Sequence, residues 1–188
     1  MLQPWTRTAS QTLLQNRWCT LRADSFRRAD GRVIEPYYIL DDPDWVHVVA
    51  TRADGQVAVV RQFRPAANTF CLELPGGVVE RGEDPLRSAQ RELREESGCT
   101  AETWRLLHVM HPNPARQTNR FHLFLATDVH ELGTQALDEN EQIEARFLPV
   151  ERILHEIHHG EFTQGLHIAA FLLALPELQR LAAAAPTA

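Results

Sequence analysis

The chain has 188 residues, of which 44% are hydrophobic and 23% are charged. This length and composition suit one soluble globular domain, or one domain with an appendage. The formal net charge is −6 and the pI is near 5.8. An acidic chain of this kind argues against nonspecific binding to nucleic acid, which needs a basic face.

Cysteine usage and hydropathy concern the compartment. Cys19, Cys71 and Cys99 are odd in number and lack the spacing of metal ligands, so we expect free thiols in a reducing environment. The first ten residues lack the apolar core of a signal peptide, and we expect no run long enough to span a membrane. These features predict a cytoplasmic protein with neither a membrane partner nor a nucleic-acid partner.

The first quarter of the chain predicts a loose arm followed by a small β subdomain. Residues 1–16 are expected to be the arm, with a partly helical stretch at Gln11–Leu14. Residues 17–44 are expected to be antiparallel strands, ending with Val33–Leu40. Gly31, in an Asp-Gly pair, supplies the positive backbone angle that a hairpin turn needs.

Residues 45–180 predict the main domain, in which strands precede and follow a central helix. Strands are expected at Trp45–Thr51, Gln56–Phe63, Phe70–Leu74, Thr103–Met110, Phe121–Thr127 and Ala145–Pro149. Helices are expected at Pro85–Ser97, Val150–His159 and Thr163–Leu175, and the alanine-rich tail 181–188 is expected to fray. This order favours an α/β fold, an α/β/α sandwich around a mixed sheet.

The central helix, Pro85–Ser97, carries the chemistry. Asp84 can cap its start, and Gly98 can end it in a left-handed turn. Glu92 and Glu96 lie one turn apart beside the apolar stripe, rather than on the solvent face. Like charges at this spacing repel, whereas Mg²⁺ prefers such oxygen ligands and often shares them with phosphates. The alternative is an ordinary solvated helix held by Glu–Arg pairs.

A fixed frame of charged and glycine positions surrounds this pair. Its members are Gly77, Glu83, Arg91, Glu92, Glu95, Glu96 and Gly98. Over its full length the frame resembles the Nudix box, the signature of Nudix hydrolases. It departs from the family pattern only at Cys99, where the family has Ile, Leu or Val, and cysteine packs as a small hydrophobe. The resemblance implies the Nudix α/β/α fold.

Flanking motifs are similar to the ADP-ribose pyrophosphatase-like branch of that family. They are Gln62-Phe63-Arg64, Glu73-Leu74-Pro75-Gly76-Gly77 and Asp138-Glu139-Asn140-Glu141. The resemblance implies that ADP-ribose or a related nucleoside diphosphate sugar is cleaved to a nucleoside monophosphate and a sugar phosphate, with Mg²⁺ or Mn²⁺. The strands before residue 50 resemble the branch's dimerisation module, which implies a homodimer. The loop 113–120 departs from the Gly/Ser-rich loop usual in members that act on ADP-ribose.

The resemblance also implies individual roles. The implied metal ligands are the Gly76 carbonyl, Glu92, Glu96 and Glu141. The implied catalytic residues are Glu139 as general base, Glu95 as a variable ligand, Arg91 as the residue that orients the carboxylates, and Glu83 as a supporting carboxylate. For Glu83 and Glu95 the alternative is pairing on the helix surface. For Glu139 and Glu141 the alternative is a polar surface loop.

Three further residues are candidates for substrate binding. Arg64 and Arg116 can make forked hydrogen bonds to phosphate oxygens, and Phe63 can stack on a base. The alternatives are an ordinary strand-end arginine for Arg64 and a core position for Phe63.

Two rival functions belong to other classes. One is a Nudix module that binds a ligand as a sensor without catalysis, against which the intact box glutamates argue. The other is a zinc peptidase, because His155, Glu156 and His159 match the His-Glu-x-x-His pattern, with His167 as a possible third ligand. The alternative for the histidines is a surface position at a helix end, where they suit the negative dipole.

Overall fold

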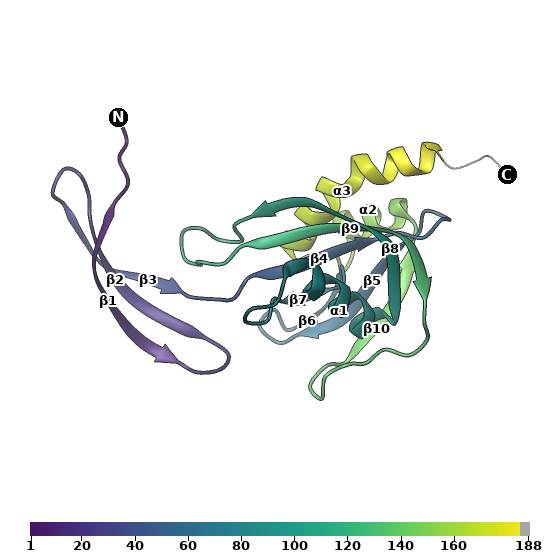
Figure 1. Ribbon diagram of the computed structural model, residues 1–188, viewed down its shortest axis with the longest axis horizontal. Helices are drawn as coiled ribbons and strands as arrows, with labels where there is room; N and C mark the ends of the chain where they lie inside the picture. The colour runs from purple at the N-terminus through teal and green to yellow at the C-terminus, as the bar shows by residue number, and fades with distance from the viewer. Residues whose placement is uncertain (185–188) are drawn as a thin grey trace. The chain divides into compact units, whose positions relative to one another are not determined.

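The structure is a computed structural model that describes residues 1–184 and divides into two compact units (Figure 1). The N-terminal unit contains Met1–Asp44 and Met110–Arg120. The second unit contains Trp45–Val109 and the chain from Phe121 onward. The chain therefore leaves the N-terminal unit after Asp44 and returns to it once, through a single excursion between two strands.

The N-terminal unit is an antiparallel sheet of β1 (Thr6–Gln15), β2 (Thr20–Arg27) and β3 (Val33–Leu40). The expected hairpin is confirmed, with Gly31 at a φ of 85°. The expected loose arm is wrong, because β1 pairs with β2 along its whole length. Every residue of β1 is exposed, so the strand has no buried face that a hydrophobic alternation could reveal.

A buried carboxylate helps to hold β1 in place. Asp24 of β2 is 1% exposed, and it accepts hydrogen bonds from Ser10 at 2.5 Å and from Arg22. These bonds make an isolated buried charge tolerable. Pairing and this polar contact, rather than apolar burial, therefore fix the arm as a strand.

The second unit contains two sheets. The mixed sheet has the order β7 (Gly76–Val78), β4 (Trp45–Ala50), β9 (Phe121–Glu131) and β8 (Cys99–Met110), with β4 parallel to β9 and antiparallel to β7. The other sheet is antiparallel, in the order β10 (Ile143–Leu148), β5 (Val57–Arg64) and β6 (Thr69–Glu73). All six expected strands are confirmed, with shifted ends at several of them.

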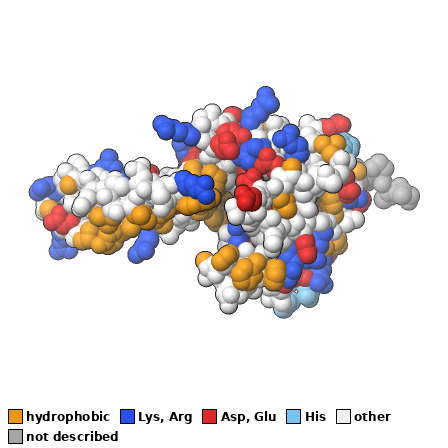
Figure 2. Space-filling view, turned by 90° about the horizontal axis from the view of Figure 1, so that it is seen from below, with side chains coloured by type: hydrophobic (Ala, Val, Ile, Leu, Met, Phe, Trp, Pro, Cys, Tyr) orange, Lys and Arg blue, Asp and Glu red, His pale blue; other side chains and the backbone are white. Residues whose placement is uncertain are grey.

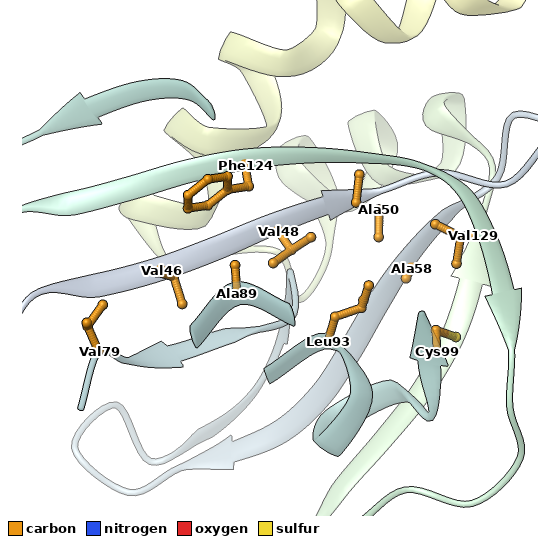
Figure 3. Close-up of a cluster of buried hydrophobic side chains, with 11 residues drawn as sticks. Val46, Val48, Ala50, Ala58, Val79, Ala89, Leu93, Cys99, Phe124 and Val129 are labelled. Atoms are coloured by element: carbon orange, nitrogen blue, oxygen red, sulfur yellow. The ribbon is translucent and has the colours of Figure 1, made fainter. Parts of the chain in front are cut away.

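Helix α1 (Pro85–Ser97) contacts strands of both sheets. Its Ala89 and Leu93 are fully buried and meet β4 residues such as Val48 in the core shown in Figure 3. Asp84 caps its start as expected, and Gly98 ends it at a φ of 68°. This packing fixes the position of the helix, and with it that of Glu92 and Glu96, which lie beside the apolar stripe.

Two more helices follow, α2 (Val150–His159) and α3 (Gly165–Ala184), and α3 contacts β4. α3 runs past the expected end at Leu175 and includes Pro176. Residues 181–184 of the expected frayed tail are helical, and residues 185–188 lie outside the described part of the chain. We expected no run long enough to span a membrane. That expectation was wrong, because α3 is long and apolar enough to do so by length and composition alone. Its buried residues, such as Phe171 and Ala174, recur at helical spacing and so form one face of the helix.

Candidate active site

Gly76 is held where no larger residue fits. β6 ends at Glu73, and the chain then passes to β7, in which Gly76 pairs with His47 of β4. A Cβ atom on Gly76 would collide with the backbone carbonyl of Val46 and with His47. The glycine that the sequence singled out therefore allows two backbones to approach closely.

The carboxylates of α1 lie against this segment. Glu96 Oε2 accepts a hydrogen bond of 2.8 Å from the Gly76 backbone N–H. A Cβ atom on Gly77 would lie 2.5 Å from Glu92 Oε1, so the Glu92 carboxylate occupies the space that this glycine leaves open. The structure thus brings Gly76, Glu92 and Glu96 together, and their role as metal ligands stays a prediction.

Burial makes both carboxylates reluctant to ionise. Glu92 is 8% exposed and Glu96 is 4% exposed. Burial raises the pKa of Glu92 to about 7, with the charges of Glu95 and Glu141 adding to the effect and Arg91 opposing it. Burial likewise raises the pKa of Glu96 to about 8, with Glu92 and Glu141 adding to it. Without a cation, the two carboxyl groups therefore take up or release protons near neutral pH.

Arg91 connects three carboxylates of the box. Its Nη1 donates to Glu92 at 2.8 Å and to Glu95 at 3.0 Å, and its Nη2 donates to Glu83 at 3.2 Å. Nη2 also donates to the Val78 carbonyl. Glu83, just before α1, and Glu95, on α1, therefore both pair with the arginine that also binds Glu92.

The acidic loop 132–142 is tied to the end of α1. The Leu132 N–H donates to the Gly98 carbonyl at 2.8 Å, and the Ala136 N–H donates to the Glu95 carbonyl at 3.0 Å. The Gln135 side chain donates to the Glu96 carbonyl and, at 3.2 Å, to the Ile143 carbonyl. The last carbonyls of a helix lack partners within it, so the loop satisfies them. Sequence reasoning missed Gln135, since only this three-dimensional contact gives it a role.

The two acidic candidates of this loop differ in their surroundings. Glu141 accepts a hydrogen bond of 2.9 Å from the Asp138 N–H, and its charge contributes to the raised pKa values of Glu92 and Glu96. Glu139 is exposed. Within residues 1–184, no contact ties Glu139 to the box glutamates. The charge of Glu141 therefore acts on the predicted metal ligands Glu92 and Glu96.

Arg64 forms an ion pair instead of standing free. Its Nε and Nη2 donate to the two oxygens of Glu73 at 2.9 and 2.5 Å. Glu73 is fully buried and also accepts from Gln62 at 3.2 Å. The guanidinium side chain retains 41% exposure, so its remaining edge is what a phosphate could reach.

Phe63 is neither a core residue nor a neighbour of Arg64 on the same face. Side chains alternate along a strand, and Gln62 and Arg64 both turn toward Glu73. Phe63 is 45% exposed and meets Phe70 edge-on, with ring centroids 5.4 Å apart. The alternative of a core position for Phe63 is therefore wrong.

Arg116 belongs to the N-terminal unit. It is exposed, and its carbonyl accepts a hydrogen bond of 2.7 Å from the Leu40 N–H at the end of β3. Its backbone thus contributes to the structure of that unit.

The His-Glu-x-x-His pattern does not form a peptidase site. His155 and His159 are exposed, whereas Glu156 is 8% exposed and turned inward. Glu156 accepts hydrogen bonds from Arg152 and from the Glu161 N–H, which closes the helix end. His167 is buried on α3 and accepts from the Leu74 N–H. The glutamate that would activate water is therefore committed to the fold.

The residues present fit a hard divalent cation. Among residues 1–184, no three Asp, Glu, His or Cys side chains form a ready cluster. Mg²⁺, however, is usually held by one or two carboxylates together with waters and phosphates. Two buried carboxylates with raised pKa values, packed against the backbone of Gly76 and Gly77, provide that donor set.

Comparison with known families identifies the domains of this chain. The chain belongs to the Nudix family: the model of the NUDIX domain matches residues 43–166. The model of the nucleoside diphosphate sugar hydrolase N-terminal domain matches residues 5–40. The second match includes β1, which sequence reasoning had assigned to the arm.

Individual relatives agree with the family. The chain is 29% identical over 166 residues to an ADP-ribose pyrophosphatase of Mycobacterium tuberculosis, covering 87% of this chain and 80% of that protein. It is 32% identical over 124 residues to one of Bacillus subtilis, covering 65% and 67%. The fold is similar to a solved ADP compounds hydrolase, with a TM-score of 0.82 at 19% identity over 96% of this chain and 97% of that one.

Proposed function

We propose that this Nudix hydrolase cleaves the diphosphate of ADP-ribose or a related nucleoside diphosphate sugar, giving a nucleoside monophosphate and a sugar phosphate. The observation that carries the proposal is the buried pair Glu92 and Glu96 against Gly76 and Gly77. The names of the two pyrophosphatase relatives support the substrate class.

We propose that the divalent cation is Mg²⁺ or Mn²⁺. Its ligands would be Glu92, Glu96, the Gly76 carbonyl and Glu141. A bound cation of this kind polarises phosphate oxygens and lowers the pKa of a bound water. Arg91 orients Glu92, and the free edge of Arg64 is available to a phosphate oxygen. Glu139 is the proposed general base, since an exposed loop carboxylate can be aimed at a water over the site.

A panel of nucleotide sugars tests this proposal. Each is incubated with the protein in Mg²⁺ or Mn²⁺, and released monophosphate and sugar phosphate are measured by chromatography. We expect turnover of at least one ADP-sugar, and a loss of about 100-fold or more in Glu96→Gln with the fold intact. Metal-dependent binding without turnover of any sugar would favour the sensor module instead.

The general base is tested separately. Glu139→Gln should lower kcat by about 100-fold and leave Mn²⁺ binding unchanged. Glu141→Gln should weaken Mn²⁺ binding. If Glu141→Gln lowers kcat and retains metal affinity, Glu141 is the base.

We also propose a homodimer in the cytoplasm. The N-terminal unit exposes large hydrophobic side chains, including Trp5, Leu14, Trp18 and Tyr38, and Figure 2 shows hydrophobic side chains gathered along one side of it. Contiguous exposed apolar surface commonly marks an interface. The three cysteines are unpaired, which suits a reducing compartment.

A further inference from the structure

Two stacked histidines lie next to the segment that contains Gly76. His47 comes from β4 and His167 from α3, and they are 6% and 2% exposed. Their ring centroids are 3.8 Å apart and their planes differ by 18°. His47 is the strand partner of Gly76. The proposed catalytic and metal-binding roles do not use His167.

His167 makes two polar contacts with the segment that leads to Gly76. Its Nδ1 accepts a hydrogen bond of 3.0 Å from the Leu74 N–H. In the neutral ring, Nε2 therefore carries the proton, and it lies 3.5 Å from Glu73 Oε2. Burial lowers the pKa of His167 well below its usual value, so the ring is neutral and its two nitrogens have opposite roles.

The first contact meets a need of the backbone. Leu74 is buried and follows the last residue of β6, so its N–H lies beyond the strand ladder. A buried N–H without an acceptor is costly. A side chain from a helix 93 residues further along supplies that acceptor.

The three residues from Leu74 to Gly76 are thus fixed from three elements. His167 of α3 binds Leu74, the Val48 N–H of β4 donates to the Pro75 carbonyl at 2.8 Å, and Glu96 of α1 accepts from Gly76. The β4 and α1 contacts belong to elements that carry the site itself. The α3 contact is the one that reaches the segment from outside.

We propose that His167 is a positioning residue for the metal site. By holding Leu74 and Glu73, it sets the direction of the Gly76 carbonyl and N–H toward the cation and Glu96. This inference rests on the proposed metal role of Gly76 and Glu96. His167 acts through the backbone. Its Nδ1 holds the Leu74 N–H and its Nε2 faces Glu73, so the two contacts can be removed separately.

Two conservative substitutions separate the nitrogens. The amide oxygen of asparagine can occupy the place of Nδ1, and the amide of glutamine can occupy the place of Nε2. His167→Asn should therefore keep the bond to Leu74, and His167→Gln should lose it. His167→Leu removes both contacts. Phe171→Leu, which changes a fully buried residue of the same helix, is the control for altered packing of α3.

The measurement is Mn²⁺ binding without substrate, followed by the electron paramagnetic resonance signal of free Mn²⁺. Circular dichroism confirms that each variant is folded. We expect His167→Gln and His167→Leu to weaken Mn²⁺ binding by about 10- to 100-fold, the usual effect of removing a group that orients a ligand. His167→Asn and Phe171→Leu should bind within about threefold of the unmodified chain. The Mg²⁺ concentration for half-maximal activity should change in the same order.

Equal Mn²⁺ affinity in His167→Asn and His167→Gln would overturn the proposal, as would unchanged affinity in a folded His167→Leu. If His167→Leu does not fold, the asparagine and glutamine variants decide alone. Glu96→Gln is measured in parallel. Unchanged Mn²⁺ binding in Glu96→Gln means that the proposed metal site itself fails, which distinguishes that failure from one confined to His167.

Discussion

Glu92 and Glu96 are unusual as single residues because the fold buries acidic groups that have raised pKa values. Arg91 pairs with Glu92 but is shared with Glu83 and Glu95. The positive charge that acts on Glu96 is Arg64, which is paired with Glu73, so each glutamate is neutralised only in part. Each unit of pKa shift corresponds to about 1.4 kcal/mol. Burying these groups costs the folded chain free energy, and under the proposed metal role a bound cation would restore part of it, which links stability to metal and to pH.

The sign of this link is testable on the metal-free chain. Glu96 has a pKa of about 8 when folded, against 4.5 as its ordinary value. The folded chain therefore keeps a proton that the unfolded chain releases. The stability that this group contributes is present below about pH 4.5 and is lost as the pH rises through about 8. Thermal unfolding in EDTA should show Tm falling across this range.

Glu96→Gln is the control for that titration, because an amide does not ionise. Its Tm should vary less between pH 5 and about pH 8 than that of the unmodified chain. Added Mg²⁺ should raise Tm most at the alkaline end. A Tm that rises with pH in the unmodified chain would contradict the assignment.

A second prediction concerns Gly77. In Gly77→Ala, the new Cβ would press on the Glu92 carboxylate, which is the movable end of a side chain. We expect kcat/KM to fall by about 10- to 100-fold while Tm stays close to that of the unmodified chain. Gly165→Ala is the matched control, since a Cβ there meets nothing within 4 Å. A large loss of Tm in Gly77→Ala would show a backbone role instead.

At the scale of elements, the predictability of each segment follows its burial pattern. α1 could be read from the sequence because its cap, its apolar stripe and its end signal agree. β1 could not, because all its side chains are exposed. The length of α3 was underestimated at Pro176, since tertiary packing overrides the usual effect of proline in a helix.

The site was predictable to the same extent. The box residues lie on one helix at fixed spacing, so Glu92 and Glu96 could be placed from the sequence. The pairing of Arg64 with Glu73 and the contact of His167 with Leu74 join residues 9 and 93 positions apart. Such contacts depend on how strands and helices pack, which no local pattern encodes.

Gln135 provides the prediction at this scale. Gln135→Ala removes two hydrogen bonds between the acidic loop and its neighbours, each worth about 1 kcal/mol. We expect kcat to fall several-fold with a small change in Tm, because the loop that carries Glu139 and Glu141 loses its side-chain tether to α1 but keeps the two backbone hydrogen bonds. The exposed Gln142 of the same loop, changed to alanine, is the control. Equal kcat values in the two variants would rule out the tether.

For the whole molecule, the prediction is the oligomeric state. We expect a dimer by size-exclusion chromatography with light scattering. Leu14→Arg and Trp18→Arg should each shift it toward the monomer, since a charge at an apolar interface is costly to desolvate. Leu106→Arg, at an exposed position of β8 in the other unit, should remain a dimer. A monomeric unmodified chain would contradict the homodimer.

The contacts that hold residues 74–76 from three elements also bear on which backbone near the site can move. Amide hydrogens at Leu74 and Gly76 are engaged by a helix side chain on one side and a carboxylate on the other, so their exchange with deuterated solvent should be slow. The tip of the acidic loop, around Glu139, is exposed and should exchange rapidly. We therefore expect the backbone at Leu74–Gly76 to stay in place on the timescale on which the tip of the acidic loop moves.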